Sequence, residues 1–216
     1  MRVFVDSGRI KHVGLLLLVA VTFLSRSVSA QDGFEGSPNL EPIEDSFIEQ
    51  YRTTSEMIYR QVDGRVWITP SGSVVDGRGF PRLFVDIFGP PLNSHFAKTA
   101  VTYDYSVKSK HHPWATAQKM VYEAMRIEGA TQAEANLTFM LLRATGTRWA
   151  TQGPSNCFSR CHGPNAKLEW RPVVKDEDVI GLVDWARNEL LSLDEIDSRV
   201  ADVILDEGPH SSIGIR

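Results

Sequence analysis

The chain has 216 residues, 42% of them hydrophobic, and its formal net charge is −4 at pH 7. An acidic chain of this kind lacks the basic surface that binding to nucleic acid or to anionic lipid requires. The length suits one domain with an appendage, or two very small domains.

The first thirty residues have the pattern of a secretory signal peptide. Arg2, Arg9 and Lys11 form a basic region, residues 13–24 are an apolar run, and a small-x-small sequence ends at Ala30. The apolar run is short for a membrane span, and an uncleaved anchor is the alternative. We therefore expect an exported protein, periplasmic or extracellular, with no stable membrane span after residues 1–30 are removed.

The next hundred or so residues predict a lead-in, a hairpin and helices. Residues 31–45 are polar, contain Gly and Pro, and are typical of a flexible lead-in. Residues 46–148 form the predicted main domain. Asp63-Gly64 lies between two apolar, β-branched segments, which predicts a β-hairpin.

Three helices are predicted after the glycine-rich loop "PSGSVVDGRGFPR" (residues 70–82) and the stop "GPP" (residues 89–91). The first begins near residue 93 or 94 and ends at about 109, and the second covers 116–127. The third begins with the capping-box pattern of Thr131 and Glu134 and continues to Gly146. Their short links indicate antiparallel neighbours.

The last part of the chain predicts a connector and two helices. Residues 149–175 are expected to be an irregular connector that contains the only two cysteines. Residues 176–216 are expected to form a helical extension, with an amphipathic helix over 176–191 and a second helix from Ser192 to about 205. The predicted fold is α+β: an N-terminal β-hairpin packed on a three-helix core, with two additional C-terminal helices.

A single carboxylate interrupts the apolar face of the first predicted helix. Asp104 shares a helical stripe with small apolar residues (Ala97, Ala100, Val101 and Val107). A buried carboxylate must be hydrogen-bonded, paired or bound to a metal. Asp104 either belongs to a site or anchors the preceding loop, through backbone N–H groups or through Arg78 or Arg82. Asp76, in the glycine-flanked loop, is a second candidate, or a turn-stabilising partner of Arg82.

Three segments in order resemble domain-of-unknown-function family 1353, a family often labelled phage-related. They are "DGRGFPR" (76–82), "YDYSV" (103–107), and "TAQ" through "EAM" (116–125), and the resemblance covers about residues 55–148. The family patterns are "TDxASxPR", "HDYLY" and "EADxxFxxAM". The resemblance implies a site at Asp76, Tyr103, Asp104 and Gln118, and it favours a bacterial source; the family itself has no known activity.

This chain departs from the family pattern at two of those positions. Tyr103 replaces the family's His, and Gln118 replaces its Asp. A His-Asp pair facing an Asp could bind a metal or activate water, whereas Tyr is a weak base and Gln carries no charge. The resemblance therefore implies a degenerate site, in which Tyr103 and Gln118 form a neutral network with Asp104.

The cysteine segment "NCFSRCHGP" has several interpretations. In an oxidising compartment, Cys157 and Cys161 predict a local disulfide. With His162 the segment also resembles a widened haem attachment, and it could supply three zinc ligands, with no fourth evident.

These observations leave three functional hypotheses. The first is a non-enzymatic interaction or envelope-associated module, with an unknown protein or envelope partner and no cofactor. The second is a secreted hydrolase that uses Asp76 and Asp104, with Glu123 or Tyr103 as further candidates and a divalent metal as an option. The third is a small haem-binding periplasmic protein that uses Cys157, Cys161 and His162.

Overall fold

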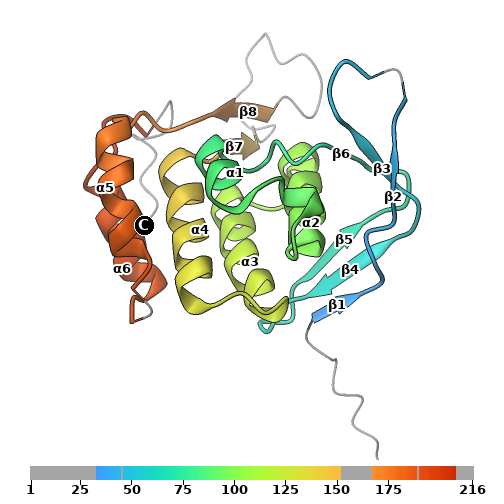
Figure 1. Cartoon of the computed structure of the whole chain (residues 1–216), viewed down its shortest axis with the longest axis horizontal. Coiled ribbons are helices and arrows are strands. Elements are labelled where there is room, and N and C mark those ends of the chain that lie inside the picture. Colours follow the sequence, from blue (N-terminus) through green and yellow to red (C-terminus); the bar gives the residue numbers. More distant parts are fainter. Residues whose placement is uncertain (1–32, 45, 152–166, 189, 208–216) are drawn as a thin grey trace, which may run out of the picture.

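The computed structural model describes residues 33–44, 46–151, 167–188 and 190–207 (Figure 1). Three helices, α2 to α4, stand side by side in the middle of the molecule. Strands β1 to β6 lie at one end, and helices α5 and α6 lie at the other. Both helices and antiparallel sheets are present, so the predicted α+β class is confirmed.

The predicted β-hairpin is confirmed. Strands β4 (Met57–Arg60) and β5 (Val66–Thr69) pair antiparallel, with Tyr59 opposite Trp67. Both of these aromatic side chains point inward and are buried. Gly64 lies in the turn with a φ of 85°, a conformation that glycine adopts without strain.

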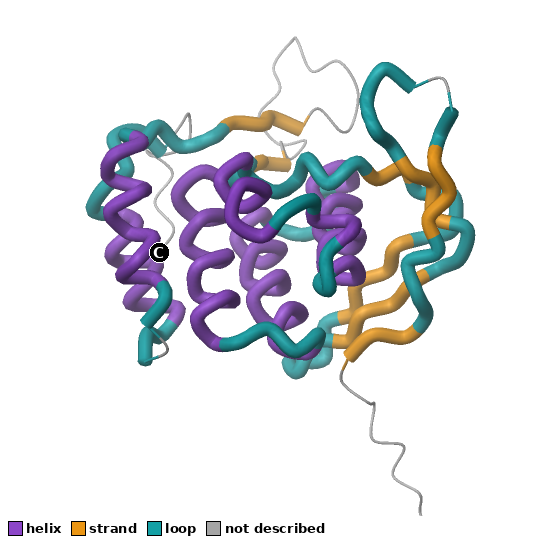
Figure 2. The backbone as a smooth tube through the Cα atoms, in the orientation of Figure 1, coloured by secondary structure: helices purple, strands orange, loops and turns teal. Residues whose placement is uncertain are grey.

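The segment expected to be a flexible lead-in, 31–45, instead contains two strands. Strand β1 (Gly33–Glu35) pairs with β4, and β2 (Leu40–Pro42) pairs with β3 (Tyr51–Thr53). Strand β3 also pairs with β6 (Val74–Val75), so two three-stranded antiparallel sheets result (Figure 2). The polar composition of 31–45 did not reveal these strands, because among its described residues only Phe34 and Leu40 pack their side chains against the core and backbone pairing contributes the rest.

The three predicted central helices are confirmed. They are α2 (Ala97–Ser109), α3 (Trp114–Ile127) and α4 (Gln132–Thr145). The capping box predicted for α4 is present between Thr131 and Glu134. Two short elements precede them: helix α1 (Arg82–Phe88), which was not predicted from the sequence, and the 3₁₀ turn η1 (Pro91–Asn93).

The connector at 149–175 is more regular than expected. Strands β7 (Arg148–Thr151) and β8 (Lys167–Trp170) pair antiparallel. The two predicted C-terminal helices are present as α5 (Asp176–Ala186) and α6 (Leu193–Ala201), and both end a few residues earlier than the amphipathic pattern indicated.

Helices α5 and α6 complete the main core. Leu182 of α5 and Ile196 of α6 are buried in the same apolar cluster as Met140 of α4. The Asn136 side-chain amide also donates to the Asn188 carbonyl oxygen over 2.7 Å. Residues 176–207 therefore stabilise the central helices and do more than extend the chain beyond them.

In the described ranges, no helix has both the length and the apolarity that a membrane span requires. The predicted signal peptide at residues 1–30 lies outside the described residues, as do Cys157, Cys161 and His162.

Candidate functional site

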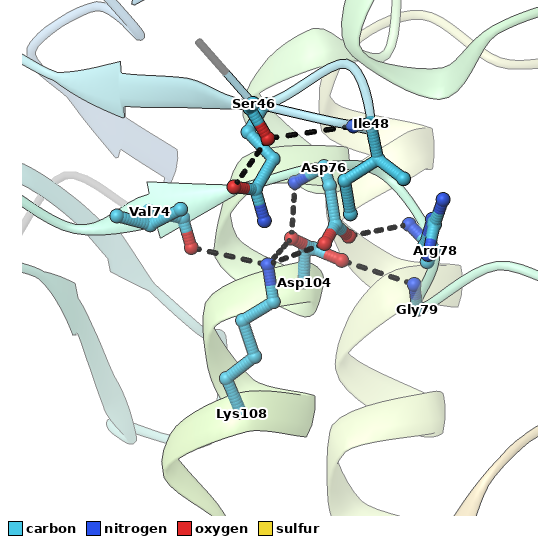
Figure 3. Close-up of polar contacts among 9 residues, drawn as sticks. Ser46, Ile48, Val74, Asp76, Arg78, Gly79, Asp104 and Lys108 are labelled. Carbon is cyan, nitrogen blue, oxygen red and sulfur yellow. Dashed lines mark hydrogen bonds and ion pairs between the residues drawn. The ribbon is translucent and has the colours of Figure 1, made fainter. Parts of the chain in front are cut away.

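Asp104 holds the glycine-rich loop against helix α2. Its side chain is 1% exposed and belongs to a helix whose other inward residues are small or apolar. One carboxylate oxygen accepts the Asp76 backbone N–H over 2.9 Å, and the other accepts the Gly79 backbone N–H over 3.0 Å (Figure 3). The geometry is that of the loop anchor considered in the sequence analysis, with backbone groups as partners.

Lys108 supplies the positive charge that this carboxylate needs. Its ammonium nitrogen is 3.0 Å from Asp104 Oδ2 and 3.1 Å from Asp76 Oδ2, and it donates to the Val74 carbonyl oxygen over 3.1 Å (Figure 3). Sequence reasoning named Arg78 and Arg82 as partners and overlooked Lys108. The signal was present, because residues four apart on a helix lie on the same face.

Asp76 is the second acidic residue at the loop. Its carboxylate also accepts the Arg78 backbone N–H over 3.0 Å. Burial alone would raise the pKa of this carboxyl group, but the Arg78 N–H and the Lys108 ammonium outweigh burial and hold it below its usual value. Arg82, the partner expected for Asp76, instead pairs with Asp86 on the surface at 3.9 Å.

The loop approaches α2 at a glycine. A Cβ atom at Gly79 would lie 3.3 Å from Asp104 Oδ1, the Tyr103 ring and Val107. The next residue, Phe80, then packs edge-on against the Tyr103 ring, with 5.1 Å between the ring centroids. A small residue at position 79 therefore lets the loop backbone reach the Asp104 carboxylate.

Tyr103 and Gln118 lie together in the core, as the family resemblance implied. Both are fully buried, and the Gln118 amide nitrogen donates to the Leu142 carbonyl oxygen over 2.9 Å. Burial raises the pKa of the Tyr103 hydroxyl well above its usual value, which nearby Gln118 only partly offsets, so this group stays protonated at neutral pH.

The neutral network expected between Tyr103, Gln118 and Asp104 is not formed. Among the described residues, the Tyr103 hydroxyl and the Gln118 carbonyl oxygen have no hydrogen-bond partner. Asp104 directs its oxygen atoms to the loop and to Lys108, and neither Tyr103 nor Gln118 is among its hydrogen-bond partners.

The four predicted positions thus divide into two groups. Asp76 and Asp104 meet at the loop, and Tyr103 meets Gln118 in the core. Glu123 on α3 takes part in none of the polar contacts described for Asp76 or Asp104. Across the described ranges, no three His, Cys, Asp or Glu side chains cluster closely enough to hold a metal ion.

Comparison with known proteins confirms the resemblance. Residues 51–142 match the family model described as "Protein of unknown function (DUF1353)". The matched segment includes the loop, α2 and α3, all of which contribute to the site.

Two curated relatives come from Sinorhizobium fredii (strain NBRC 101917 / NGR234). Uncharacterized protein y4jT is 24% identical over 47% of this chain and 30% of its own length. Uncharacterized protein y4iH is 26% identical over 42% of this chain and 38% of its own length. The matches thus span only about a third of each relative. No solved structure matches the chain significantly.

Proposed function

We propose that this protein is an exported, non-catalytic interaction module built on the scaffold of the family. The observation that supports this proposal is the structural role of the two acidic residues. Asp76 and Asp104 hold the loop to α2 through backbone N–H groups and through Lys108. These contacts support a structural role for both carboxylates.

Export is the second part of the proposal. It rests on the basic region, the apolar run and the small-x-small sequence within residues 1–30. Both curated relatives are bacterial, which favours the periplasm or the extracellular space of a bacterium as the location.

The hydrolase hypothesis has weaker support in the geometry. Its metal would bind where Asp76 and Asp104 approach each other. The Lys108 ammonium group already lies within 3.1 Å of both carboxylates at that point. A lysine there supplies the charge that a divalent cation would otherwise supply. The haem hypothesis depends on Cys157, Cys161 and His162, outside the described residues, and stays a prediction.

A test combines metal analysis with an Asp104 variant of the protein that starts at Gln31, produced in an oxidising compartment. We expect no stoichiometric metal, no visible absorption band, and a melting temperature that a chelator leaves unchanged. Asp104→Ala leaves the buried Gly79 N–H and the partly buried Asp76 N–H without an acceptor, and each such loss costs about 1–3 kcal/mol. We therefore expect the free energy of unfolding to fall by about 2–5 kcal/mol.

The matched control is Asp86→Ala, which removes an exposed carboxylate and only a 3.9 Å ion pair. We expect this change to alter stability by less than about 1 kcal/mol. A stoichiometric metal that is lost in the Asp104 variant would make Asp104 a metal ligand and would support the hydrolase hypothesis instead. A haem absorption band would support the haem hypothesis, in which the cysteine segment is the functional site.

A further inference from the structure

Strand β5 forms one edge of its sheet. The strand order is β1-β4-β5, so β5 has a strand partner on one side only. The Gln61 N–H donates to the Arg65 carbonyl oxygen over 2.9 Å, which marks this pair as hydrogen-bonded. Because bonded and non-bonded pairs alternate in antiparallel sheets, the backbone groups of Val66 and Ile68 point away from β4.

These outward backbone groups are available for pairing. In the part of the chain that the structure describes, no hydrogen bond involves the backbone of Val66 or Ile68 outside the sheet ladder. Their side chains lie on the outer face of the sheet and are 37% and 49% exposed. An apolar edge without charged or proline residues is a template for another strand.

A groove runs along this edge. It has a volume of about 180 Å³, and it separates β5 from the C-terminal half of α2 and the turn that follows. The strand side is formed by Val66, Trp67 and Ile68, and the other side includes Tyr105, His111 and His112. A strand edge that faces a helix across a groove can receive an extended peptide, with main-chain bonds to the strand and side chains in the groove.

The charges beside the groove favour an acidic occupant. The pKa of His112 is lowered, first by burial and then by the positive charges of nearby Arg65 and His111. Asp63 pairs with Arg65 at 3.3 Å, and Glu169 pairs with Lys110, the residue directly before His111. Four cationic or protonatable groups, including Lys110, therefore lie beside two carboxylates on a protein that is acidic overall.

We propose that the β5 edge binds an extended segment of a partner protein in which apolar and acidic residues alternate. The apolar residues would contact Val66 and Ile68, and the acidic residues would face Arg65, His111 and His112. This inference rests on the proposed interaction function, and it assigns that function a surface and a class of partner.

The test is a selection from a phage-displayed library of random dodecapeptides on the immobilised protein that starts at Gln31. We expect the enriched peptides to alternate apolar residues with Asp or Glu. The affinity of a synthesised winner is then measured by calorimetry. Ile68→Pro removes the outward N–H without breaking a bond to β4, and it should weaken binding about tenfold. Arg65→Ala should weaken it several-fold, with a reduced salt dependence.

Two controls keep the result interpretable. Ile180→Thr changes an exposed apolar residue on α5 and should leave the affinity unchanged. Unchanged far-UV circular dichroism shows whether Ile68→Pro still folds, and Ile68→Lys serves as the second edge variant if it does not.

Several outcomes would overturn this inference. They are a selection without enrichment, enriched peptides without acidic residues, and binding that both Ile68 variants leave intact. A concentration-dependent dimer that Ile68→Lys abolishes would identify a second copy of the chain as the occupant, and would also overturn it. If the protein is metal-free and the selection yields no peptide, only the proposed β5 binding site is rejected. The non-catalytic proposal is tested separately, by metal analysis and by Asp104→Ala.

Discussion

Lys108 follows Asp104 by one turn of α2, and its ammonium nitrogen lies about as close to Asp76 as to Asp104, at 3.1 and 3.0 Å. Replacing Lys108 with Met leaves two neighbouring carboxylates without a counter-charge. Removal of one partner from a buried ion pair costs about 3–5 kcal/mol, and the 38% exposure of Lys108 reduces this cost. We expect Lys108→Met to lower the free energy of unfolding in urea by about 1–3 kcal/mol at pH 7.

The same variant makes a prediction about pH. The folded-state pKa of Asp76 lies below its ordinary value of 3.8, so its stabilising contribution is present above that value and is lost as pH falls through the folded pKa. Without Lys108 the folded pKa should rise. The stability difference between wild type and Lys108→Met should therefore narrow as the pH falls below about 4. A difference that stays constant from pH 7 to pH 3.5 would mean that Lys108 acts through packing. Lys119→Met, on α3, is the exposed control.

The sequence predicted the position of the site better than its contacts. Helical spacing placed Asp104 on the apolar face, where a buried carboxylate requires partners, and the contacts found are those of the loop-anchor alternative. Only the structure distinguishes the two alternatives for Asp104, because the sequence does not show which backbone N–H groups of the loop lie near this residue. Lys108 could have been identified from its four-residue spacing to Asp104, whereas Arg78 and Arg82 were named because they belong to the loop that Asp104 was expected to anchor.

A pair of glycine substitutions tests the close approach of the loop to α2. At Gly79 an added Cβ would meet three atoms at 3.3 Å, one of them the Asp104 carboxylate oxygen. We expect Gly79→Ala to destabilise the protein by about 1–3 kcal/mol. Gly181 lies inside α5, and beyond its own helix backbone no described atom comes within 4 Å of the place that a Cβ would take. Gly181→Ala should therefore stabilise by about 0.5–1 kcal/mol. Thermal melts of both variants are the measurement, and equal effects would contradict the tight contact at Gly79.

The elements of the fold that could be predicted are those with a recognisable side-chain pattern. Helices α2 to α4 have apolar stripes or a capping box, and the β4–β5 hairpin has Asp63-Gly64 at its turn. Strands β1 and β2 are three residues each and lie among polar residues, and strands β7 and β8 flank a long intervening segment. Such strands are held by pairing with segments distant in sequence, which local patterns do not encode.

Glu128 is expected to stabilise helix α2 from outside. It lies at the end of α3, and its carboxylate accepts the backbone N–H groups of Lys98 and Thr99 over 3.2 and 2.9 Å, and the Thr99 hydroxyl over 2.6 Å. Phe96 occupies the N-cap position of α2 but its side chain makes no capping hydrogen bond, and Glu128 supplies these bonds from α3 instead. We expect Glu128→Ala to lower the free energy of unfolding by about 1–2 kcal/mol. Glu123→Ala, on the same helix, should cost less than about 0.5 kcal/mol; equal losses in urea unfolding would contradict the capping role.

The C-terminal helices should unfold together with the family segment, although the family match ends at residue 142. Ile196 of α6 is fully buried in the shared core, so Ile196→Ala should cost about 2–4 kcal/mol. Ile180 of α5 is 63% exposed, and Ile180→Ala should change stability by less than about 0.5 kcal/mol. Urea unfolding followed by tryptophan fluorescence and by far-UV circular dichroism should give coincident transitions in both variants. An early transition that removes only part of the helical signal in Ile196→Ala would show that α5 and α6 form a separate unit, and that the segment 51–142 is stable without them.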